Sequence, residues 1–456
     1  MWVSHNNMAM VSSPGQSAPS TLLSFTAENT RSYRDEVHLS LLATRLSAEG
    51  VPRSVVPTGM TRPVRVLPAV GIFGANASGK TTILRAMEDM RRLVATSFRH
   101  GSRDTRVARS PFLLDPASAE RPTRFEVDLL LEGVRWVYRF AVDDRRVLEE
   151  SAYYWPRGRR SLVFRRREAE LVFGSPFGAK DRTIEDLLRG NALLLSVAGA
   201  TENRVLAALF DWFNSNLLLM ESDNRVPRAF MTADMASKQD QRKRILQILQ
   251  AADFGITSLT VSPLDDEDAE QLRRVFSLIR QVDGDPDLPD PLETDVVSFR
   301  QLGLTHSGAE DDVTLGPEDE SQGTLVWVSL IGPMLQALDD GTVVLVDEID
   351  VSLHSDLVRL FVEMFQDPQT NHNGAQLIFN SHDGALLEGV GAWSLGRDQI
   401  WFTEKYANGA TKLYSLDDFG PRRDDDIRGR YFRGRYGAIP VIGDASLRNA
   451  LAPSGE

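Results

Sequence analysis

The pattern of apolar and polar positions predicts a parallel sheet whose strands lie far apart in the sequence. Apolar runs typical of strands buried on both faces occur at 66–73, 343–346 and, with Gln376 as the one polar residue, 375–379. Apolar residues at helical spacing follow the first run at 83–94 and the second at 357–365. This order predicts an α/β fold that is split into two halves by an insertion.

Between the two halves the pattern changes twice. From residue 123 to about 173 apolar residues alternate with polar ones, which predicts an antiparallel β meander. Residues 183–256 have helical spacing, and the acidic section at 264–320 predicts loops or partial disorder, as does the polar stretch 44–63. We therefore expect four parts: a disordered N-terminus at 1–20, a first half with the meander at 21–180, a helical and acidic insert at 181–315 and a second half at 316–445.

The first apolar run leads into Gly-Ala-Asn-Ala-Ser-Gly-Lys-Thr, which matches the phosphate-binding loop pattern GxxxxGK[ST]. Glycines let successive backbone N–H groups face a phosphate, and the N-terminus of the following helix adds a partial positive charge. Lys80 can contact the β and γ phosphates, and the hydroxyl of Thr81 can bind Mg²⁺. The sequence thus predicts a site for ATP and Mg²⁺ formed by Gly74, Ala75, Asn76, Ala77, Ser78, Gly79, Lys80, Thr81 and Thr82.

Polar residues follow the other two buried strands. Asp347 and Glu348 end the apolar run at 343–346, so Asp347 is a candidate Mg²⁺ residue and Glu348 a candidate for polarising the attacking water. His382 follows the run at 375–379, and strand ends converge on one edge of such a sheet. His382 is therefore a candidate contact to the γ-phosphate.

The segment Glu320-Ser321-Gln322-Gly323-Thr324 precedes a long apolar helix at 325–338. Serine and glycine at a helix start can form a second anion site, and they can equally well be an ordinary helix cap. The spacing alone leaves both interpretations open.

Composition narrows the class of protein. The chain has 456 residues, 42% of them hydrophobic and 25% charged, and no apolar run long enough to span a bilayer. The absence of cysteine fits a reducing cytoplasm, so we expect a cytoplasmic protein without a membrane partner. The net charge of −13 argues against a protein that coats nucleic acid along its whole surface.

Two local clusters of arginine leave nucleic acid as a possible partner. Both clusters have aromatic residues nearby, and this combination can bind a phosphate backbone and stack bases. They can also be solvated faces that pair with the acidic insert, and both interpretations stay open. The residues are Arg157, Arg159, Arg160, Arg165, Arg166 and Arg167 in the meander, and Arg422, Arg423, Arg428, Arg430, Arg433 and Arg435 near the end.

These motifs in this order resemble a known family. The chain resembles the ABC-type ATPase heads of the structural-maintenance-of-chromosomes, double-strand-break-repair and overcoming-lysogenization-defect proteins. The resemblance is closer to the stand-alone, RloA-type AAA-family ATPases of bacterial antiphage and abortive-infection modules. The resemblance covers about 20–440. The residues that carry it are 25–33, 74–81, 321–324, Asp347-Glu348-Ile349-Asp350 with Leu353-His354, 381–383, 397–402 and 433–440.

The resemblance implies an ABC-type P-loop NTPase head that hydrolyses ATP between two copies of the chain. Ser321 and Gly323 would be the signature motif that contacts the γ-phosphate of ATP held by the second copy. Glu348 would be the catalytic base and His382 the switch histidine, and Asn29 and Arg31 would lie near the nucleotide. A homodimer or a higher even-numbered oligomer follows, with control of a separate effector protein, expected to be a nuclease, in antiphage defence.

One feature departs from that family. ABC heads use a glutamine between the phosphate-loop helix and the signature motif to sense Mg²⁺ and the γ-phosphate, yet no glutamine occurs between Gln16 and Gln239. Either a residue in the 105–120 loop substitutes, or sensing is altered. Two other functions therefore stay open: a DNA-repair ATPase that binds DNA itself, and an ATP-bound scaffold with very slow turnover.

Overall fold

The computed structural model describes most of the chain between residues 20 and 440. The described residues are 20–47, 50–99, 102, 105–177, 182–221, 225–265, 267, 269–270, 274, 299–389, 394–422 and 424–440. The disorder expected at 1–20 lies outside them apart from Ser20, and so does much of the acidic section. No helix in the described part is long and apolar enough to cross a membrane.

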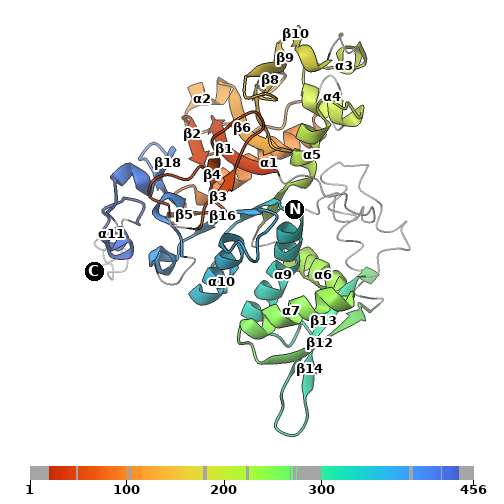
Figure 1. The fold of residues 1–456 in the computed structure, drawn as a ribbon, viewed down its shortest axis with the longest axis vertical. Helices are drawn as coiled ribbons and strands as arrows, with labels where there is room; N and C mark the ends of the chain where they lie inside the picture. The colour runs from red at the N-terminus through yellow and green to blue at the C-terminus, as the bar shows by residue number, and fades with distance from the viewer. Residues whose placement is uncertain are drawn as a thin grey trace, which may run out of the picture.

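The core is a six-stranded sheet assembled from distant parts of the sequence (Figure 1). All neighbouring strands are parallel except the last pair, which is antiparallel. The three predicted apolar runs form its central strands, which are entirely buried, as expected for a parallel sheet covered on both faces. The order is β11 (Leu217–Met220), β15 (Val343–Val346), β16 (Gln376–Ser381), β5 (Ala69–Gly74), β17 (Ile400–Lys405) and β18 (Thr411–Ser415).

Helices cover both faces of this sheet. Val70 and Ile72 of β5 pack in one core with α1 (Lys80–Thr96), α4 (Leu194–Ala200) and α5 (Ala207–Ser215). The alternate residues Ala69 and Phe73 pack in a second core with α9 (Gln322–Asp340) and α10 (Ser355–Gln366). In Figure 1, α1 and α5 accordingly lie above the core sheet and α9 and α10 below it.

A second, seven-stranded sheet confirms the predicted meander. Consecutive strands from 123 to 173 pair antiparallel, and the two N-terminal strands extend the sheet. Its inner residues share the first core with α1. The order is β10 (Glu170–Phe173), β9 (Ser161–Arg167), β8 (Val147–Tyr154), β7 (Val134–Val142), β6 (Thr123–Leu131), β1 (Thr21–Glu28) and β2 (Val37–Ser40).

The insert combines helices with a small sheet. Helices α6 (Arg225–Ala236) and α7 (Gln239–Ala251) pack beside β12 (Ile256–Pro263), β13 (Arg300–His306) and β14 (Val313–Leu315), and the β13–β14 hairpin projects from the molecule (Figure 1). The expectation of loops throughout 264–320 is therefore wrong for β13 and β14. Alternating Leu302 and Leu304 bury one face of β13 in the second core.

Short elements complete the described part. A hairpin of β3 (Arg53–Val55) and β4 (Val64–Val66) occupies part of the stretch expected to be a loop. At the other end of the chain, the ring of Phe402 stacks on both Tyr431 and Tyr436, with 5.5 Å between ring centroids in each case. The remaining elements are α2 (Pro116–Glu120), η2 (Ser175–Phe177), α3 (Arg182–Leu187), η3 (Gly384–Leu387), η4 (Arg397–Gln399), η5 (Leu416–Phe419) and α11 (Ile427–Phe432).

Candidate functional site

The phosphate loop connects the buried strand β5 to the start of α1. Gly79 at the N-cap of α1 has a φ of 105°, a backbone conformation that is strained for any residue with a side chain. The Nζ atom of Lys80 donates to the carbonyl oxygens of Gly74 (2.8 Å) and Ala75 (3.1 Å), so the ammonium group lies inside the loop. The loop therefore has the shape and the charge to hold a chain of phosphates.

Hydroxyl groups of other elements form hydrogen bonds with the phosphate loop. Ser78 and Thr403 of β17 share a hydrogen bond between hydroxyls at 2.6 Å, and Thr411 of β18 donates to the Ser78 carbonyl at 3.0 Å. The buried Tyr33 donates to the Gly79 carbonyl at 3.2 Å. The loop is thus fixed by β17, by the edge strand β18 and by the segment after β1.

The acidic residues after β15 lie against the first residues of α1. The hydroxyl of Thr81 donates to Oδ1 of Asp347 at 2.8 Å, and the Nδ2 atom of Asn380 donates to the same oxygen at 2.5 Å. Burial raises the pKa of Asp347, and these two hydrogen bonds act in the opposite direction. The Oδ1 atom of Asn380 also accepts from the Glu348 N–H at 2.6 Å, so one buried amide positions both acidic residues.

The residues present fit Mg²⁺. Thr81 and Asp347 supply neighbouring hard oxygen atoms, and Mg²⁺ is usually held by one or two protein oxygens together with phosphate and water. In the described part of the chain no group of three or more acidic or histidine side chains could hold a metal ion alone. A metal here would therefore be held jointly by the protein and the nucleotide.

Glu348 lies close enough to Lys80 to act on it electrostatically. The backbone of Glu348 has a φ of 52°, a strained conformation of the kind that clusters at functional sites. Burial lowers the pKa of Lys80, and the carboxylates of Asp350, Glu348 and Asp347 oppose that shift. Three carboxylates thus act electrostatically on the single ammonium group of the loop.

His382 has a partner that the sequence analysis did not assign. Its Nε2 atom lies 3.2 Å from Oδ2 of Asp350, whose side chain is only 6% exposed. The Oδ1 atom of Asp350 is buried without a hydrogen-bond partner among the described residues. The signal in the sequence was the second aspartate of Asp347-Glu348-Ile349-Asp350, but nothing local indicated which residue it would contact.

Ser321 and Gly323 lie at a different place. Ser321 is the N-cap of α9 and accepts from the Thr324 N–H at 3.1 Å, and a Cβ on Gly323 would come 3.1 Å from the carbonyl of Ser352. The segment therefore borders the loop that follows Glu348. No contact recorded among the described residues joins Ser321 or Gly323 to the phosphate loop.

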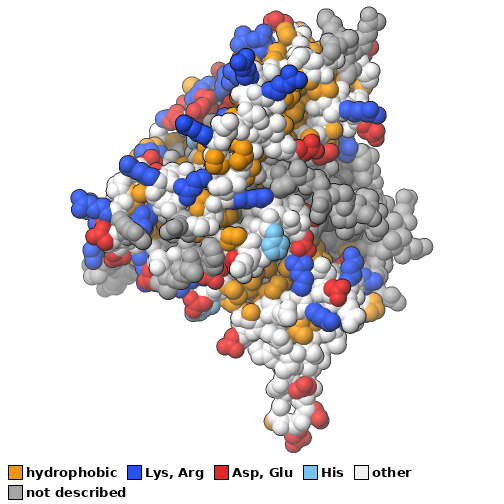
Figure 2. Space-filling model, in the orientation of Figure 1, with side chains coloured by type: hydrophobic (Ala, Val, Ile, Leu, Met, Phe, Trp, Pro, Cys, Tyr) orange, Lys and Arg blue, Asp and Glu red, His pale blue; other side chains and the backbone are white. Residues whose placement is uncertain are grey.

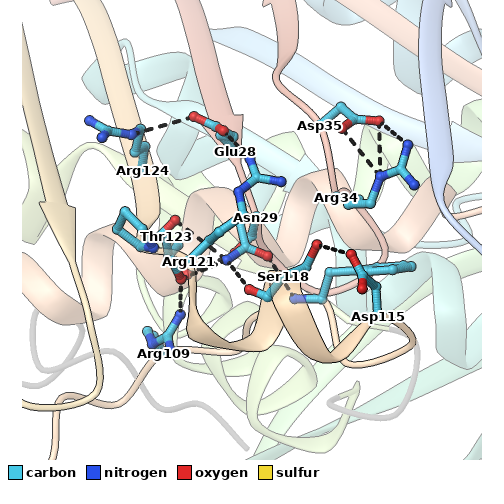
Figure 3. Close-up of polar contacts among 12 residues, drawn as sticks. Glu28, Asn29, Arg34, Asp35, Arg109, Asp115, Ser118, Arg121, Thr123 and Arg124 are labelled. Atoms are coloured by element: carbon cyan, nitrogen blue, oxygen red, sulfur yellow. Dashed lines mark hydrogen bonds and ion pairs between the residues drawn. The ribbon is translucent and has the colours of Figure 1, made fainter.

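The structure places the Asn29 side chain at the loop that follows α1 (Figure 3) and the Arg31 side chain against α1 itself. The Nδ2 atom of Asn29 donates to the carbonyls of Ser118 and Arg121, both at 2.8 Å, and its Oδ1 accepts from the Phe112 N–H. Arg31 forms a bidentate pair with Asp89 of α1. Both side chains are thus engaged in holding neighbouring segments, and neither has a recorded hydrogen bond to the phosphate loop.

Taken together, these elements define an α/β fold with a phosphate loop at the ligand edge of a parallel sheet, an antiparallel meander and an inserted region, as the sequence predicted. Residues 69–388 match the family model described as "AAA domain, putative AbiEii toxin, Type IV TA system". The match spans more than half of the chain, so the chain belongs to this AAA family of ATP-binding ATPases.

Solved structures give more distant similarities. A structure of the SmcHead bound to the C-winged helix domain of ScpA is 14% identical, with a TM-score of 0.41, and the match covers 88% of this chain and 99% of that one. The SMC head domain from Thermotoga maritima is 10% identical (TM-score 0.37, 86% and 98% covered). The recombination mediator RecF is also 10% identical (TM-score 0.35, 88% and 100% covered). No curated protein sequence matches the chain.

Proposed function

We propose that the chain is a Mg²⁺-dependent ATPase that closes as a head-to-tail homodimer around two ATP molecules. One observation carries this proposal. Gly323 borders the loop after Glu348, with a Cβ coming 3.1 Å from the Ser352 carbonyl, whereas Thr81 of the phosphate loop contacts Asp347 and no recorded contact among the described residues joins Ser321 or Gly323 to the phosphate loop. Each chain therefore holds two parts of a site that do not touch, and a second copy would bring them together.

The residues of the chain divide the work of hydrolysis. Lys80 and the backbone N–H groups of its loop bind the β and γ phosphates. Thr81 and Asp347 would hold Mg²⁺, which would neutralise charge on the phosphate oxygens when bound. Glu348 accepts a proton from water while the water oxygen bonds to the γ-phosphorus. The bond from that phosphorus to the bridging oxygen breaks, and ADP leaves with the electron pair. His382 donates a hydrogen bond to a γ-phosphate oxygen.

Glu348→Gln tests this arrangement. The amide cannot accept the proton, so the variant is expected to bind ATP, to lose turnover and to accumulate as a dimer. Light scattering after gel filtration, with ATP and with ADP, measures the mass. The wild type should show a turnover per chain that rises with protein concentration. A Glu348→Gln protein that hydrolyses ATP at the wild-type rate, or that stays monomeric with saturating ATP, would contradict the proposal.

We further propose that the dimer controls a separate effector, a nuclease, in antiphage defence. This proposal rests on the resemblance of the sequence motifs to RloA-type ATPases, and the family description itself names a putative toxin of a toxin–antitoxin system. The expected result is that a nuclease-like protein encoded beside the chain copurifies with Glu348→Gln in ATP and dissociates in ADP. Copurification that is equal in both nucleotides would contradict control by the ATP state.

Direct DNA binding is the second candidate function. The arginine and aromatic residues near the end of the chain, which suggested it, are partly used in contacts within the protein. Tyr431 and Tyr436 are buried against Phe402, and Arg428 and Arg430 pair with Glu388 and Asp425. On the face shown in Figure 2, basic and acidic side chains are interspersed. Exposed Arg165 and Arg167 remain available in the meander. Salt-sensitive binding of DNA with faster ATP turnover would favour this candidate.

A third possibility is an ATP-bound scaffold with very slow turnover. It predicts that the wild type already behaves as Glu348→Gln does. Single-turnover hydrolysis by the wild-type dimer distinguishes the scaffold from the proposed ATPase, because a scaffold would retain ATP over the time in which the proposed ATPase converts it to ADP.

A further inference from the structure

Glu221 lies at the ligand edge of the core sheet and has no role in the function described so far. Strand β11 runs parallel to β15, with Met220 opposite Val346, and the N–H of Asp347 donates to the Met220 carbonyl at 2.9 Å. Parallel strands end at the same edge of a sheet. Glu221, the first residue after β11, therefore follows directly beside Asp347.

Arg85 of α1 connects Glu221 to the candidate metal residues. Thr81 and Arg85 are four residues apart, so they share one face of the helix. The Thr81 hydroxyl contacts Asp347, while the Nε atom of Arg85 donates to Oε1 of Glu221 at 3.1 Å. The Glu221 side chain is 15% exposed and that of Arg85 is 44% exposed. A charged pair thus lies one helical turn from the hydroxyl that would bind Mg²⁺.

We propose that the Arg85–Glu221 pair senses the metal and the γ-phosphate, in place of the glutamine that this chain lacks. An amide side chain offers one acceptor and one donor, whereas a carboxylate only accepts and a guanidinium only donates. Glu221 accepts a hydrogen bond from water bound to Mg²⁺, and Arg85 supplies the donor and neutralises the additional carboxylate. This inference rests on the proposed ATPase function and deepens it.

The position of Glu221 also connects the metal to the signature segment. The Nη1 atom of Arg228 in α6 donates to the Glu221 carbonyl at 2.7 Å. Helix α6 packs closely on α9. The hydroxyl of Thr232 in α6 donates to the Val328 carbonyl of α9 at 2.7 Å and accepts from the Gly332 N–H of α9 at 3.0 Å. Since Ser321 is the N-cap of α9, these contacts join the Glu221 backbone to the helix that carries the signature segment.

The 105–120 loop, which the sequence suggested as the substitute, has other contacts. Its residues hold Asn29, and the Arg31 N–H donates to the Ser110 carbonyl at 2.6 Å. No contact recorded among the described residues joins this loop to Asp347 or to the phosphate loop. The pair at the end of β11 is therefore the better candidate.

The test is a Mg²⁺ titration of the affinity for a fluorescent ATP analogue, beside binding of the same analogue in EDTA. Glu221→Ala is expected to need about tenfold more Mg²⁺ for half-maximal effect, in line with the loss of an outer-shell metal partner. In EDTA it should bind the analogue at least as well as the wild type, because a repulsive carboxylate is gone. Glu221→Gln, which keeps an acceptor, should recover most of the Mg²⁺ response.

Two further variants complete the experiment. Arg85→Met is expected to weaken binding even in EDTA, since it removes a positive charge beside Glu221 and close to the phosphate site. Arg244→Ala breaks an exposed pair between α7 and Asp339 of α9 (2.9 Å) and should leave both titrations unchanged. A wild-type Mg²⁺ response in Glu221→Ala overturns this inference alone. A wild-type protein that binds no analogue with Mg²⁺ overturns the proposed ATPase function instead.

Discussion

The buried carboxylate of Asp350 holds the half-exposed imidazole of His382, with 3.2 Å between Oδ2 and Nε2. This contact leaves Nδ1 as the ring nitrogen free to face the nucleotide, so Asp350 acts as a positioning residue for His382. The pair thereby fixes which nitrogen of the ring can meet the γ-phosphate.

We predict that Asp350→Asn lowers kcat on the order of tenfold with little change in ATP affinity. His382→Ala should also lower kcat with little change in ATP affinity. The kcat of the double variant should be no lower than that of the more impaired single variant, because either change alone already removes the function of the Asp350–His382 pair. Steady-state kinetics and nucleotide binding measure both effects. His372→Ala, at an exposed histidine elsewhere, is the control. Additive losses in the double variant would show that the two residues act separately.

Lys80→Ala is expected to weaken ATP binding by about 10- to 100-fold, since charged hydrogen bonds to phosphate are lost. Calorimetric titration measures the change. Lys412→Ala removes a lysine from β18, where it lies over the Tyr414 ring, and should bind ATP as the wild type does. Equal affinities of Lys80→Ala and the wild type would mean that the loop does not bind the phosphates.

Asn380→Ala should lower both stability and turnover. The buried amide donates to Asp347 and accepts from the Glu348 N–H, so its removal takes one of two hydrogen bonds from the Asp347 oxygen and the side-chain acceptor from the Glu348 N–H. The expected loss in the free energy of unfolding is about 2–3 kcal/mol, measured by urea denaturation without nucleotide. Asn408→Ala, in an exposed turn, should change it by less than about 0.5 kcal/mol. A loss no larger than that of the control would contradict the role of the amide.

Two substitutions at Ser321 separate an ordinary helix cap from an anion site. Ser321→Ala should cost about 1 kcal/mol of stability, because the N-cap hydrogen bond to Thr324 is lost. Ser321→Asp keeps a good cap but places a negative charge where the γ-phosphate of the second copy is proposed to lie. It should therefore fold stably and fail to dimerise when combined with Glu348→Gln and ATP. If this double variant dimerises as Glu348→Gln does, Ser321 is only a cap.

Local sequence patterns were sufficient to predict the central strands and the phosphate loop. The runs at 66–73 and 343–346 are apolar without interruption, and the residues that follow them carry their chemistry within a few positions. Strand β11 was missed because its four residues continue the apolar spacing of α5, and a short apolar run does not distinguish strand from helix. Only pairing with β15 makes it a strand.

Tertiary pairing also explains why some contacts of the site could not be predicted from the sequence. Asp350 contacts His382, and Glu221 contacts Arg85, across large separations in the chain that no spacing rule covers. For Asn29, the resemblance predicted a place near the nucleotide, while its amide is used by three backbone groups of the 112–121 segment. Motifs located the ligand edge, and tertiary pairing decided which further side chains reach it.

The position of β5 in the middle of the core sheet has a consequence for synthesis of the protein. Its two neighbours, β16 and β17, consist of residues 376–381 and 400–405, so both edges of β5 stay unpaired until most of the chain has left the ribosome. The meander, by contrast, pairs consecutive strands and can form early. A chain interrupted before residue 376 would present an apolar strand with two open edges, which is a template for aggregation.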